Sequence, residues 1–306
     1  MPTAALSPRQ RAAILGEALP YIRSLHGKTL VIKIGGQAVA DPSLKAGFAR
    51  DVALLQLVGI RLVVVHGGGP NIPAFLRRLG LADTGGATDG SGATQTRDYV
   101  EMVLGELNQE IVALINRNGG KAVGLSGLDG PLIRGVMHAD GSPETGQVVF
   151  GEVAGIDAEI IRLLQTRNFV PVIMPIAAGN DGAATFVDAD AAAARIAEAM
   201  HAEKLLVMAD SPGLTDANGH VQSSLGIAAA EALLASTGGL AADLRARLAP
   251  VVDALKGGIG SAKLLDARVP NALLLEVLGS EGIGSLIRSR RGPDFGADTL
   301  RYFGGT

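Results

Sequence analysis

Residues 29–36 read TLVIKIGG, and residues 61–71 read RLVVVHGGGPN. Each stretch is a run of β-branched and apolar residues that ends in glycine, which is typical of a buried strand followed by a tight turn. Between them, residues 43–58 place apolar side chains at the period of a helix, and Pro70 begins a further helix that runs to Leu79. This alternation of strand and helix predicts an α/β fold built on a parallel sheet.

The same alternation continues on both sides of this unit. Ser7 and Pro8 begin a lead-in helix that we expect over residues 7–26. Further strands are predicted at 121–125, 147–153, 169–174, 203–208 and 261–265, and further helices at 94–118, 157–166, 190–201, 240–256 and 270–278. Residues 81–93 predict a loop, and the tail after Arg288 lacks periodicity. The stretch Ala177–Ala183 is the best candidate for a division between two lobes of one continuous sheet.

The composition excludes several classes of protein. The chain has 306 residues, with 27 Lys and Arg against 30 Asp and Glu, so its formal net charge of −3 excludes a polybasic nucleic-acid binder. No run approaches the roughly 18 apolar residues of a membrane span, and the N-terminus does not resemble a signal peptide, so we expect a cytoplasmic protein. Cysteine is absent, which excludes disulfides and thiolate metal sites. Four scattered histidines lack the spacing of metal ligands, and we expect no protein-held metal: His26, His138, His201 and His220.

Glycine is in clear excess, with 42 residues in the chain. The turns Gly35–Gly36 and Gly67–Gly69 leave backbone N–H groups unpaired at helix starts, and such nests bind anions. Lys33 precedes the first turn, where a lysine can offset charge during phosphoryl transfer. Either turn alone is better explained as a strand-to-helix connection, but the two together with Lys33 favour a phosphate site. The chain has no Walker motif, and no GxGxxG opens its first βα unit.

Four longer stretches resemble one known family. They read VIKIGGQAV, FARDVALLQLVGIRLVVVHGGGPNI, VEMVLGELNQEIVALINRNGGKAVGLSG and RVPNALLLEVLGSEGIGSLI. They resemble the N-acetylglutamate kinases of the amino acid kinase fold, in order and over roughly residues 7–288. This resemblance implies a three-layer αβα sandwich with a mainly parallel sheet. Residues 1–176 would form an N-terminal lobe for the acyl amino acid and for oligomer contacts, and residues 177–306 a C-terminal lobe for the nucleotide.

The resemblance also implies a reaction. The family transfers a phosphoryl group from MgATP to the γ-carboxylate of an N-acylated amino acid, which gives an acyl phosphate. The cofactors would be ATP and the Mg²⁺ that arrives with it, which requires few protein ligands. The family is usually dimeric through the N-terminal lobes or hexameric, so we expect a homodimer or a homohexamer that the lead-in helix could extend into a ring.

The resemblance also implies the site residues, each by its position in a matched motif. Lys33 would contact the transferring phosphoryl group, and Asp190 would orient the lysines, although Asp190 also fits an N-cap of the helix at 190–201. On the substrate side the resemblance implies Asn108, which could instead satisfy buried backbone groups. Backbone N–H groups from two glycine turns would bind phosphates and substrate: Gly35, Gly36, Gly67, Gly68 and Gly69. A loop that would otherwise be an ordinary Pro-Gly turn would bind ATP: Asp210, Ser211, Pro212, Gly213 and Leu214.

Departures from the family pattern concern the acceptor side. Family members carry an arginine in a GLR motif that binds the substrate α-carboxylate, but no arginine occurs between Arg78 and Arg97 here. A bidentate arginine contributes much of the binding of so small a ligand. The family's NINAD reads FVDAD at 186–190, so Phe186 replaces an amide and Asp188 adds a negative charge at the substrate side. These changes disfavour a dicarboxylate acceptor.

Two further departures concern the nucleotide lobe. The family's second catalytic lysine follows a GGM motif, whereas Gly238 and Gly239 are followed here by Leu240, and ungapped counting places Arg247 at the lysine. Arg245 and Lys256 are alternatives to Arg247 for that role. A partial arginine-sensor signature also remains, which leaves inhibition by arginine open: Glu276, Glu281 and Gly284, with Asn271 where arginine-inhibited members have His.

Three hypotheses of function follow. The leading one is an ATP-dependent carboxylate kinase of the acetylglutamate kinase type whose acceptor is altered, because Lys33, both glycine turns and Asp190 are retained. The second is a catalytically silent homologue that binds nucleotide or amino acid as a regulatory or scaffolding subunit. The third is a pocket remodelled for other chemistry on an amino acid, such as phosphate-driven ligation.

Overall fold

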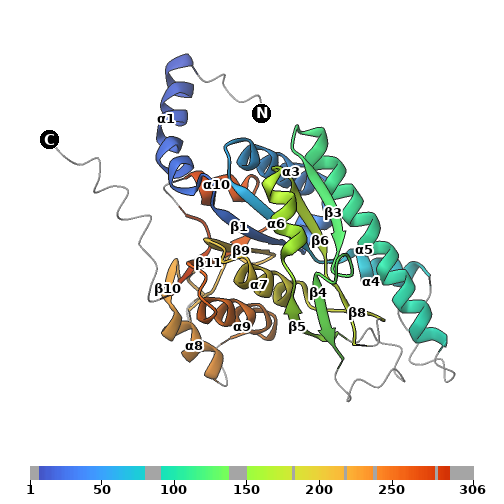
Figure 1. The fold of residues 1–306 in the computed structure, drawn as a ribbon. Coiled ribbons are helices and arrows are strands. Elements are labelled where there is room, and N and C mark those ends of the chain that lie inside the picture. The colour runs from blue at the N-terminus through green and yellow to red at the C-terminus, as the bar shows by residue number, and fades with distance from the viewer. Residues whose placement is uncertain are drawn as a thin grey trace.

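The computed structural model describes residues 7–79, 91–137, 150–180, 183–216, 219–236, 240–279 and 282–289. Its largest feature is an eight-stranded sheet in the order β10-β12-β11-β9-β1-β2-β6-β3 (Figure 1). The strands are β1 (Thr29–Ile34), β2 (Arg61–His66), β3 (Ala122–Ser126), β6 (Val170–Met174), β9 (Lys204–Ala209), β10 (Ser224–Gly226), β11 (Ser261–Asp266) and β12 (Ser285–Arg288). Within this sheet β11 and β12 pair antiparallel and the other pairs are parallel. The predicted α/β fold with a mainly parallel sheet is therefore confirmed.

A second, four-stranded sheet lies beside the first, in the order β5-β4-β7-β8. Its strands are β4 (Ile133–Val136), β5 (Glu152–Ile156), β7 (Ile176–Ala178) and β8 (Ala184–Phe186). The stretch Ala177–Ala183, which we expected to divide two lobes, connects the antiparallel pair β7 and β8 of this small sheet. The large sheet continues across the expected boundary, because β9 of the second half pairs directly with β1 of the first half.

Helices cover both faces of the large sheet. They are α1 (Pro8–Leu25), α2 (Gln37–Ala40), α3 (Pro42–Leu57), α4 (Asn71–Arg78), α5 (Ser91–Arg117), α6 (Glu159–Thr166), α7 (Ala189–Ala199), α8 (Ile227–Ala235), α9 (Ala242–Lys256) and α10 (Ala272–Leu278). α3, α5 and α10 pack on one face, and α6, α7 and α9 pack on the other. The result is the three-layer αβα sandwich that the resemblance implied.

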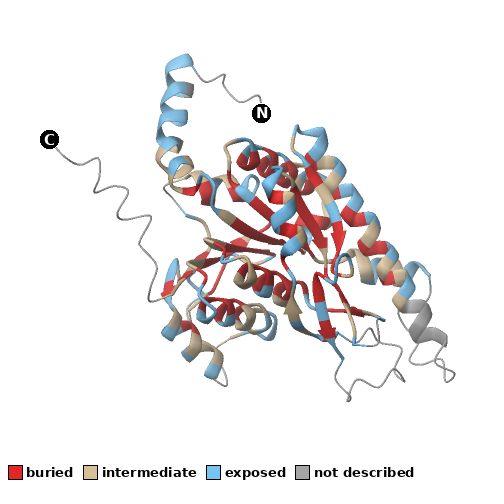
Figure 2. Ribbon diagram, in the orientation of Figure 1, coloured by how far each residue is buried: buried red, intermediate tan, exposed pale blue. Residues whose placement is uncertain are grey.

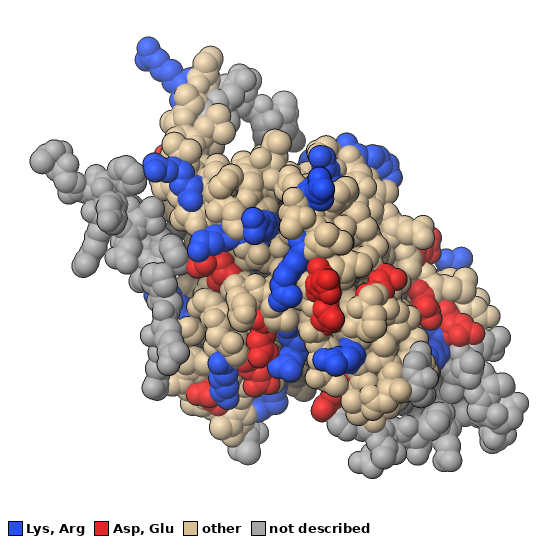
Figure 3. Space-filling model, viewed as in Figure 1, with Lys and Arg blue, Asp and Glu red and all other residues tan. Residues whose placement is uncertain are grey.

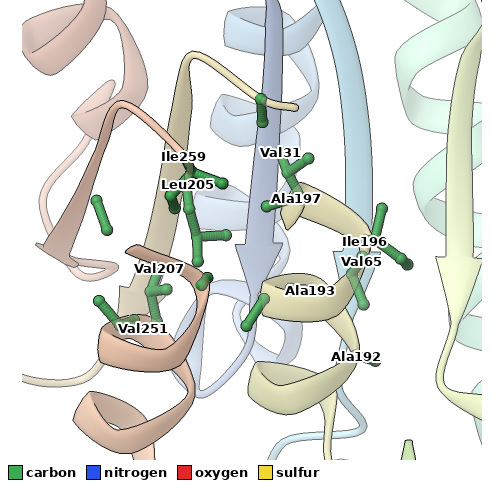
Figure 4. Packing of buried hydrophobic residues seen from close by; sticks show 14 of the residues in the cluster. Val31, Val65, Ala192, Ala193, Ile196, Ala197, Leu205, Val207, Val251 and Ile259 are labelled. Carbon is green, nitrogen blue, oxygen red and sulfur yellow. The ribbon is translucent and has the colours of Figure 1, made fainter. Parts of the chain in front are cut away.

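The alternation of side chains along β1 explains the two halves of the core. Val31 points to the α7 and α9 side, whereas Leu30 and Ile32 point to the α3 and α10 side. All three are fully buried, as expected for a central strand covered on both faces. Figure 4 shows Val31 and Val65 against the alanines of α7, whose small side chains let the helix approach the sheet closely. Figure 2 shows the same buried layer running through the centre of the molecule.

Most predicted elements are present with shifted ends. Ser7 caps α1 as expected, since its side chain accepts the Gln10 N–H and Gln10 returns the bond in a capping box. α5 begins at Ser91, so residues 91–93 of the predicted loop are helical, and the remainder of that loop lies outside the described residues. The strand predicted at 147–153 is observed as β5, which begins at Glu152.

Several short elements escaped prediction. The strands β4, β7, β8, β10 and β12 and the helices α2 and α8 have no counterpart in the sequence analysis. Strands of three or four residues are too short to establish a period, so their pairing partners rather than their sequence define them. Most of the tail after Arg288 lies outside the described residues.

Candidate active site

Both glycine turns lie at the same edge of the large sheet. β1 and β2 are parallel neighbours in which Ile34 pairs with His66, so the turns that follow them start side by side. They approach so closely that a Cβ atom on Gly69 would lie 2.9 Å from the Gly36 carbonyl oxygen. Gly36 and Gly69 also have positive φ angles of 60° and 52°, which glycine adopts without strain. The structure thus brings together the two turns that the sequence analysis singled out.

Lys33 forms a buried ion pair beside these turns. Its Nζ lies 2.8 Å from Asp190 Oδ2, and the two side chains are only 8% and 10% exposed. Lys33 comes from β1 and Asp190 from the first turn of α7, 157 positions away along the chain. Asp190 Oδ1 is buried and has no hydrogen-bond partner among the described residues. The pair thus holds one cation in a fixed place at this edge.

Asp188, and not Asp190, caps α7. The Asp188 carboxylate accepts the Ala191 N–H at 2.9 Å, and the helix begins at Ala189. The N-cap interpretation of Asp190 was therefore wrong, because Asp190 is the second residue of the helix. Burial, followed by the nearby negative charge of Asp190, raises the pKa of Asp188. The charge that Asp188 adds to this edge thus has a structural use in capping.

Asp210 bridges the two halves of the chain. Its carboxylate accepts the N–H of Gln37, the first residue of α2, through oxygens at 2.8 and 3.0 Å. A Cβ on Gly36 would lie 2.4 Å from one of the same oxygens, so only glycine fits here. In the loop that follows, Ser211 Oγ accepts the Gly213 N–H, and the Leu214 N–H donates to Ser285 Oγ at 2.8 Å. The proposed nucleotide loop is thus an ordered turn anchored to β12.

A charged pair that the sequence did not indicate lies near Asp210. Asp266, the last residue of β11, accepts two hydrogen bonds from the Arg268 guanidinium at 2.8 and 2.7 Å. Hydrogen bonding from Arg268 lowers the pKa of Asp266, and the same pairing with Asp266, followed by the smaller effect of the Asp210 charge, raises the pKa of Arg268. The available signal was position, because Asp266 ends and Arg268 follows a strand whose carboxyl end lies at the same edge as that of its parallel neighbour β9.

The candidates for a second catalytic cation on α9 have other partners. Arg247, at 25% side-chain exposure, lies 3.4 Å from Asp243 one turn earlier. Arg245 donates to the carbonyls of Leu234 and Ser236 at the end of α8. Lys256 pairs with Glu231 at 2.8 Å. Gly238 and Gly239, which precede α9, lie outside the described residues.

Two residues expected at the substrate side are buried. Asn108 is 5% exposed, and its Nδ2 donates to the Val172 carbonyl at 2.9 Å and lies 3.1 Å from His66 Nε2. Phe186 is 4% exposed and packs in a small core cluster with Val100 and Leu104. The arrangement supports the alternative that Asn108 satisfies buried backbone, while contact of either residue with a substrate stays a prediction.

Glu276, from the partial arginine-sensor signature, belongs to a buried charge cluster. Glu276 of α10 is buried and lies 2.6 Å from Lys263 and 3.7 Å from Lys204. A Cβ on Gly282 would come within 2.3 Å of Lys263 Nζ, so the chain packs tightly over this charge cluster. Asn271 precedes α10 in a left-handed conformation, and Glu281 lies outside the described residues. A buried charge network accounts for Glu276, and a response to arginine stays a prediction.

The edge around Lys33 suits a phosphate-bearing ligand. Four backbone N–H groups in the two turns have no acceptor among the described residues: those of Gly35, Gly36, Gly68 and Gly69. Convergent N–H groups beside a lysine form the kind of cradle that binds phosphate oxygens.

Within the described residues, no cluster of three His, Cys, Asp or Glu side chains has the geometry of a metal site. The described helices also include none with the length and apolar character of a membrane span.

Comparison with known proteins identifies the family. The profile of the amino acid kinase family matches residues 28–258. The acetylglutamate kinase of Nitrosomonas eutropha is 45% identical over 294 residues, which cover 93% of this chain and 98% of the relative. The acetylglutamate kinase of Chromobacterium violaceum is 44% identical over 286 residues, which cover 92% and 98%. The chain belongs to the amino acid kinase family.

Solved structures show that this family's fold is shared beyond close relatives. An N-acetylglutamate synthase from Neisseria gonorrhoeae, complexed with coenzyme A and N-acetyl-glutamate, superposes with a TM-score of 0.73 at 24% identity. That match covers 90% of this chain and 63% of the synthase. Carbamate kinase from Giardia lamblia, bound to AMP-PNP, superposes with a TM-score of 0.61 at 15% identity, over 86% of this chain and 99% of that kinase. Proteins with different names thus share the sandwich of this amino acid kinase, and its site has to be argued from its own residues.

Proposed function

We propose that the chain is an ATP-dependent kinase that phosphorylates the side-chain carboxylate of an N-acylated or otherwise modified amino acid. The observation that carries this proposal is the buried Lys33–Asp190 pair beside two glycine turns in which four N–H groups have no acceptor among the described residues. Its similarity to curated acetylglutamate kinases along most of the chain supports the same activity.

The protein's part in this reaction is positioning and electrostatic stabilisation. ATP, with its Mg²⁺, supplies the phosphoryl group. Lys33 offsets the negative charge that gathers on the transferring group, and Asp190 holds the ammonium at 2.8 Å in the required place. Gly35 and Gly36 direct N–H groups to phosphate oxygens, and the loop at Asp210–Leu214 borders the nucleotide. The protein needs to supply few ligands to the Mg²⁺, because Mg²⁺ that arrives with phosphates retains most of its waters.

The phosphoryl group passes directly from ATP to the acceptor, without a covalent intermediate on the enzyme. An oxygen of the acceptor carboxylate attacks the γ-phosphorus in line with the leaving oxygen. The bond from phosphorus to the acceptor oxygen forms while the bond to the ADP oxygen breaks, so ADP leaves as the anion. The N–H groups of Gly68 and Gly69 hold the acceptor at the end of β2, whereas the N–H of Gly67, which was expected to take part, donates to the Ile34 carbonyl at 3.0 Å.

We further propose that the acceptor differs from ordinary acetylglutamate. This finer proposal rests on the missing arginine between Arg78 and Arg97, on the phenyl ring of Phe186 and on the carboxylate of Asp188. Each change removes a group that would bind a second carboxylate or adds one that repels it. The acceptor would therefore carry its α-carboxylate masked or replaced by an uncharged group.

ATP turnover against a panel of acceptors tests both levels of the proposal. The panel contains acetylglutamate, its α-amide and α-esters, and other N-acylated acidic amino acids, with Lys33→Ala as the negative control. We expect turnover that Lys33→Ala abolishes and that is fastest with an α-masked acceptor. Fastest turnover with acetylglutamate would overturn the altered acceptor but not the kinase, and no turnover with any acceptor would overturn both.

A silent homologue is the second candidate, and the α9 cations are the observation that favours it. Arg245, Arg247 and Lys256 all have partners away from Lys33, so no second cation from α9 reaches the pair among the described residues. Calorimetric titration with AMP-PNP and Mg²⁺ separates the candidates. Nucleotide binding together with turnover that Lys33→Ala abolishes supports the kinase, whereas nucleotide binding without turnover of any acceptor, or no nucleotide binding, supports the silent homologue.

We also infer that the protein is a homo-oligomer that uses α1. Three apolar side chains of this helix are exposed in the single chain: Ile14 at 51%, Leu15 at 72% and Leu19 at 53%. Figure 2 shows α1 extending from the body with little of its surface covered. Light scattering should give the mass of a dimer or a hexamer, with a smaller assembly after Leu15→Glu and Leu19→Glu. A monomer mass for the wild type would contradict the inference.

A further inference from the structure

The carboxylate of Asp210 lies directly against the glycine turn that follows β1. Its two oxygens lie 2.8 and 3.0 Å from the backbone nitrogen of Gln37, so both accept the same N–H. A Cβ on Gly36 would come within 2.4–2.5 Å of both oxygens and the carbon between them. In the proposed reaction the loop that Asp210 begins borders the nucleotide, but this carboxylate has no task.

Asp210 fixes one end of the turn. The peptide that joins Gly36 to Gln37 is held twice, because its N–H donates to Asp210 and its carbonyl accepts the Val39 N–H at 3.4 Å. Gly36 has φ 60° and ψ −139°, a conformation that glycine alone adopts readily. A residue with so much freedom keeps one conformation only where outside contacts hold it, and the Asp210 carboxylate is such a contact.

The other end of the turn is fixed by β2. The carbonyl of Ile34 accepts the Gly67 N–H at 3.0 Å. Between the two fixed ends lies the peptide that joins Gly35 to Gly36, whose N–H has no acceptor among the described residues. Because a peptide unit is a rigid plane, this one keeps a single rotation, about the line that joins its two Cα atoms.

Lys33 stands beside that same line. A Cβ on Gly35 would lie 3.1 Å from Lys33 Nζ, so the ammonium group is next to the Gly35 end, just as Asp210 is next to the Gly36 end. With both ends in place, the free N–H moves on a short arc near the ammonium group. If the Gly36 end were released, this N–H would no longer stay within reach of an anion bound to Lys33.

The charge of Asp210 acts against such an anion. A carboxylate beside an anion site repels the ligand, although the nearby cation of Arg268, on which the Asp210 charge acts, offsets part of this repulsion. The charge of Asp210 and its hydrogen bond to Gln37 therefore have opposite effects on an anion at the turn. Substitution can separate the two effects.

We propose that Asp210 is a positioning residue that holds the Gly36 end of the turn, so that the Gly36 N–H and the Lys33 ammonium bind the same phosphate group. It does so through the Gln37 N–H, and hence through the backbone rather than by touching the nucleotide. That the ligand is a polyphosphate rests on the proposed function.

Two variants separate the hydrogen bond from the charge. Asp210→Asn keeps an oxygen that accepts the Gln37 N–H and removes the charge, whereas Asp210→Ala removes both. Binding is measured by calorimetry with AMP-PNP and with tripolyphosphate, which has no ribose or base, each with Mg²⁺. We expect Asp210→Ala to weaken binding of both probes at least tenfold, and Asp210→Asn to bind both within threefold of the wild type or more tightly.

Three results would overturn the proposal. A loss in Asp210→Ala with AMP-PNP but not with tripolyphosphate would mean that Asp210 touches the nucleoside. An equal loss in both variants would mean that the charge itself binds, for example through the metal ion. Unchanged or tighter binding of tripolyphosphate by Asp210→Ala would mean that only the repulsion matters.

Asp41 provides a matched control for loss of stability. Its Oδ1 accepts the N–H groups of Ser43 and Leu44 at 2.7 and 3.0 Å, so it too joins a carboxylate to the start of a helix. We expect Asp41→Ala to lower stability in urea denaturation without changing the affinity for tripolyphosphate. If Asp41→Ala and Asp210→Ala lost affinity in proportion to their loss of stability, Asp210 would have a structural role alone, and the proposal would fail.

The contact itself is tested without any ligand. Hydrogen exchange of the full chain, followed by NMR, should show the Gln37 amide protected in the wild type and in Asp210→Asn but not in Asp210→Ala. Fast exchange of this amide in the wild type would overturn the proposal. If the wild type binds neither probe, the proposed function fails, and the exchange measurement still decides whether Asp210 holds the turn.

Discussion

The ion pair of Lys33 and Asp190 gives the most direct test of the site. At 2.8 Å and an effective dielectric constant of about 20, the Coulomb attraction of the pair is about 6 kcal/mol. Removal of both ions from water offsets much of that attraction, but removal of one partner leaves a buried charge without compensation, which costs about 3–5 kcal/mol. Lys33→Met and Asp190→Asn should therefore each destabilise the fold by that amount.

The double variant should cost less than the sum of the single ones. Without either charge no uncompensated ion remains, so we expect a coupling free energy of at least about 2 kcal/mol in a double-mutant cycle. The assay is urea denaturation of the wild type, both single variants and the double variant, with turnover measured alongside. Both single variants should also lose turnover, because Lys33 is either absent or no longer held in place.

A matched control uses a pair of similar length on the surface. Arg195 and Glu198 of α7 lie 2.7 Å apart but are 44% and 33% exposed. Arg195→Met with Glu198→Gln should show a coupling of only about 0.3–0.5 kcal/mol, because water screens the charges. If the Lys33–Asp190 cycle gives a coupling no larger than this control, the two residues do not form a buried pair in solution, and the argument for the site fails.

Burial raises the pKa of Asp51 to about 6, so the folded state binds its proton more tightly than the unfolded state and loses stability as the pH rises through 4 to 6. Asp51→Asn should therefore add about 1–3 kcal/mol to the free energy of unfolding at pH 8 and little at pH 4, measured by urea denaturation, and equal effects at the two pH values would contradict this. The pH dependence due to His66 has the opposite sign, because burial lowers the pKa of His66 to about 4. Its contribution to the free energy of unfolding is complete above pH 6.5 and falls by about 3 kcal/mol toward pH 4, and His66→Asn should remove this dependence. Gly124→Ala should destabilise the fold because the added methyl would lie 2.1 Å from Asn108 Oδ1, and Asn108→Ala in the same chain should recover part of the loss, unless the strand moves aside. Gly105→Ala on α5 is the control for the method: with nothing within 4 Å of the added carbon it should stabilise by about 0.5–1 kcal/mol, and a loss of stability there would show that the space around these glycines is misjudged.

Charge on the surface is mixed and contributes little to these arguments. Figure 3 shows Lys and Arg interspersed with Asp and Glu on the face in view. Exposed pairs of this kind each stabilise by at most about 1 kcal/mol. The informative charges are the buried ones, which lie at the ends of strands and between helices and strands.

Much of the site was predictable from the sequence because it depends on local pattern. Lys33 lies within a β-branched run and the turns at Gly35 and Gly67 follow such runs directly, and the carboxyl ends of neighbouring parallel strands lie at one edge. The resemblance to the family added Asp190, which lies far away along the chain and has no local signature that links it to Lys33. The structure confirms that the two meet.

Other features of the site were beyond prediction. Asp188 and Asp190 are alike in the sequence, and only the start of α7 at Ala189 decides which of them caps the helix. For Asp266 and Arg268 the sequence showed only that they lie at the end of a strand, and the strand order decides that this strand lies beside β9 and hence near Asp210.

By itself the sequence determined the alternation of strands and helices, the two glycine turns and the lysine beside them, because hydrophobic period and turn chemistry act over a few residues. Only the tertiary structure decided the partners of the buried polar groups: Asp190 for Lys33, Asn108 for His66 and Gln37 for Asp210. These partners come from elements brought together by the order of strands in the sheet. Many strand orders bury the same hydrophobic pattern equally well, whereas a buried charge or imidazole requires one particular neighbour at hydrogen-bond distance.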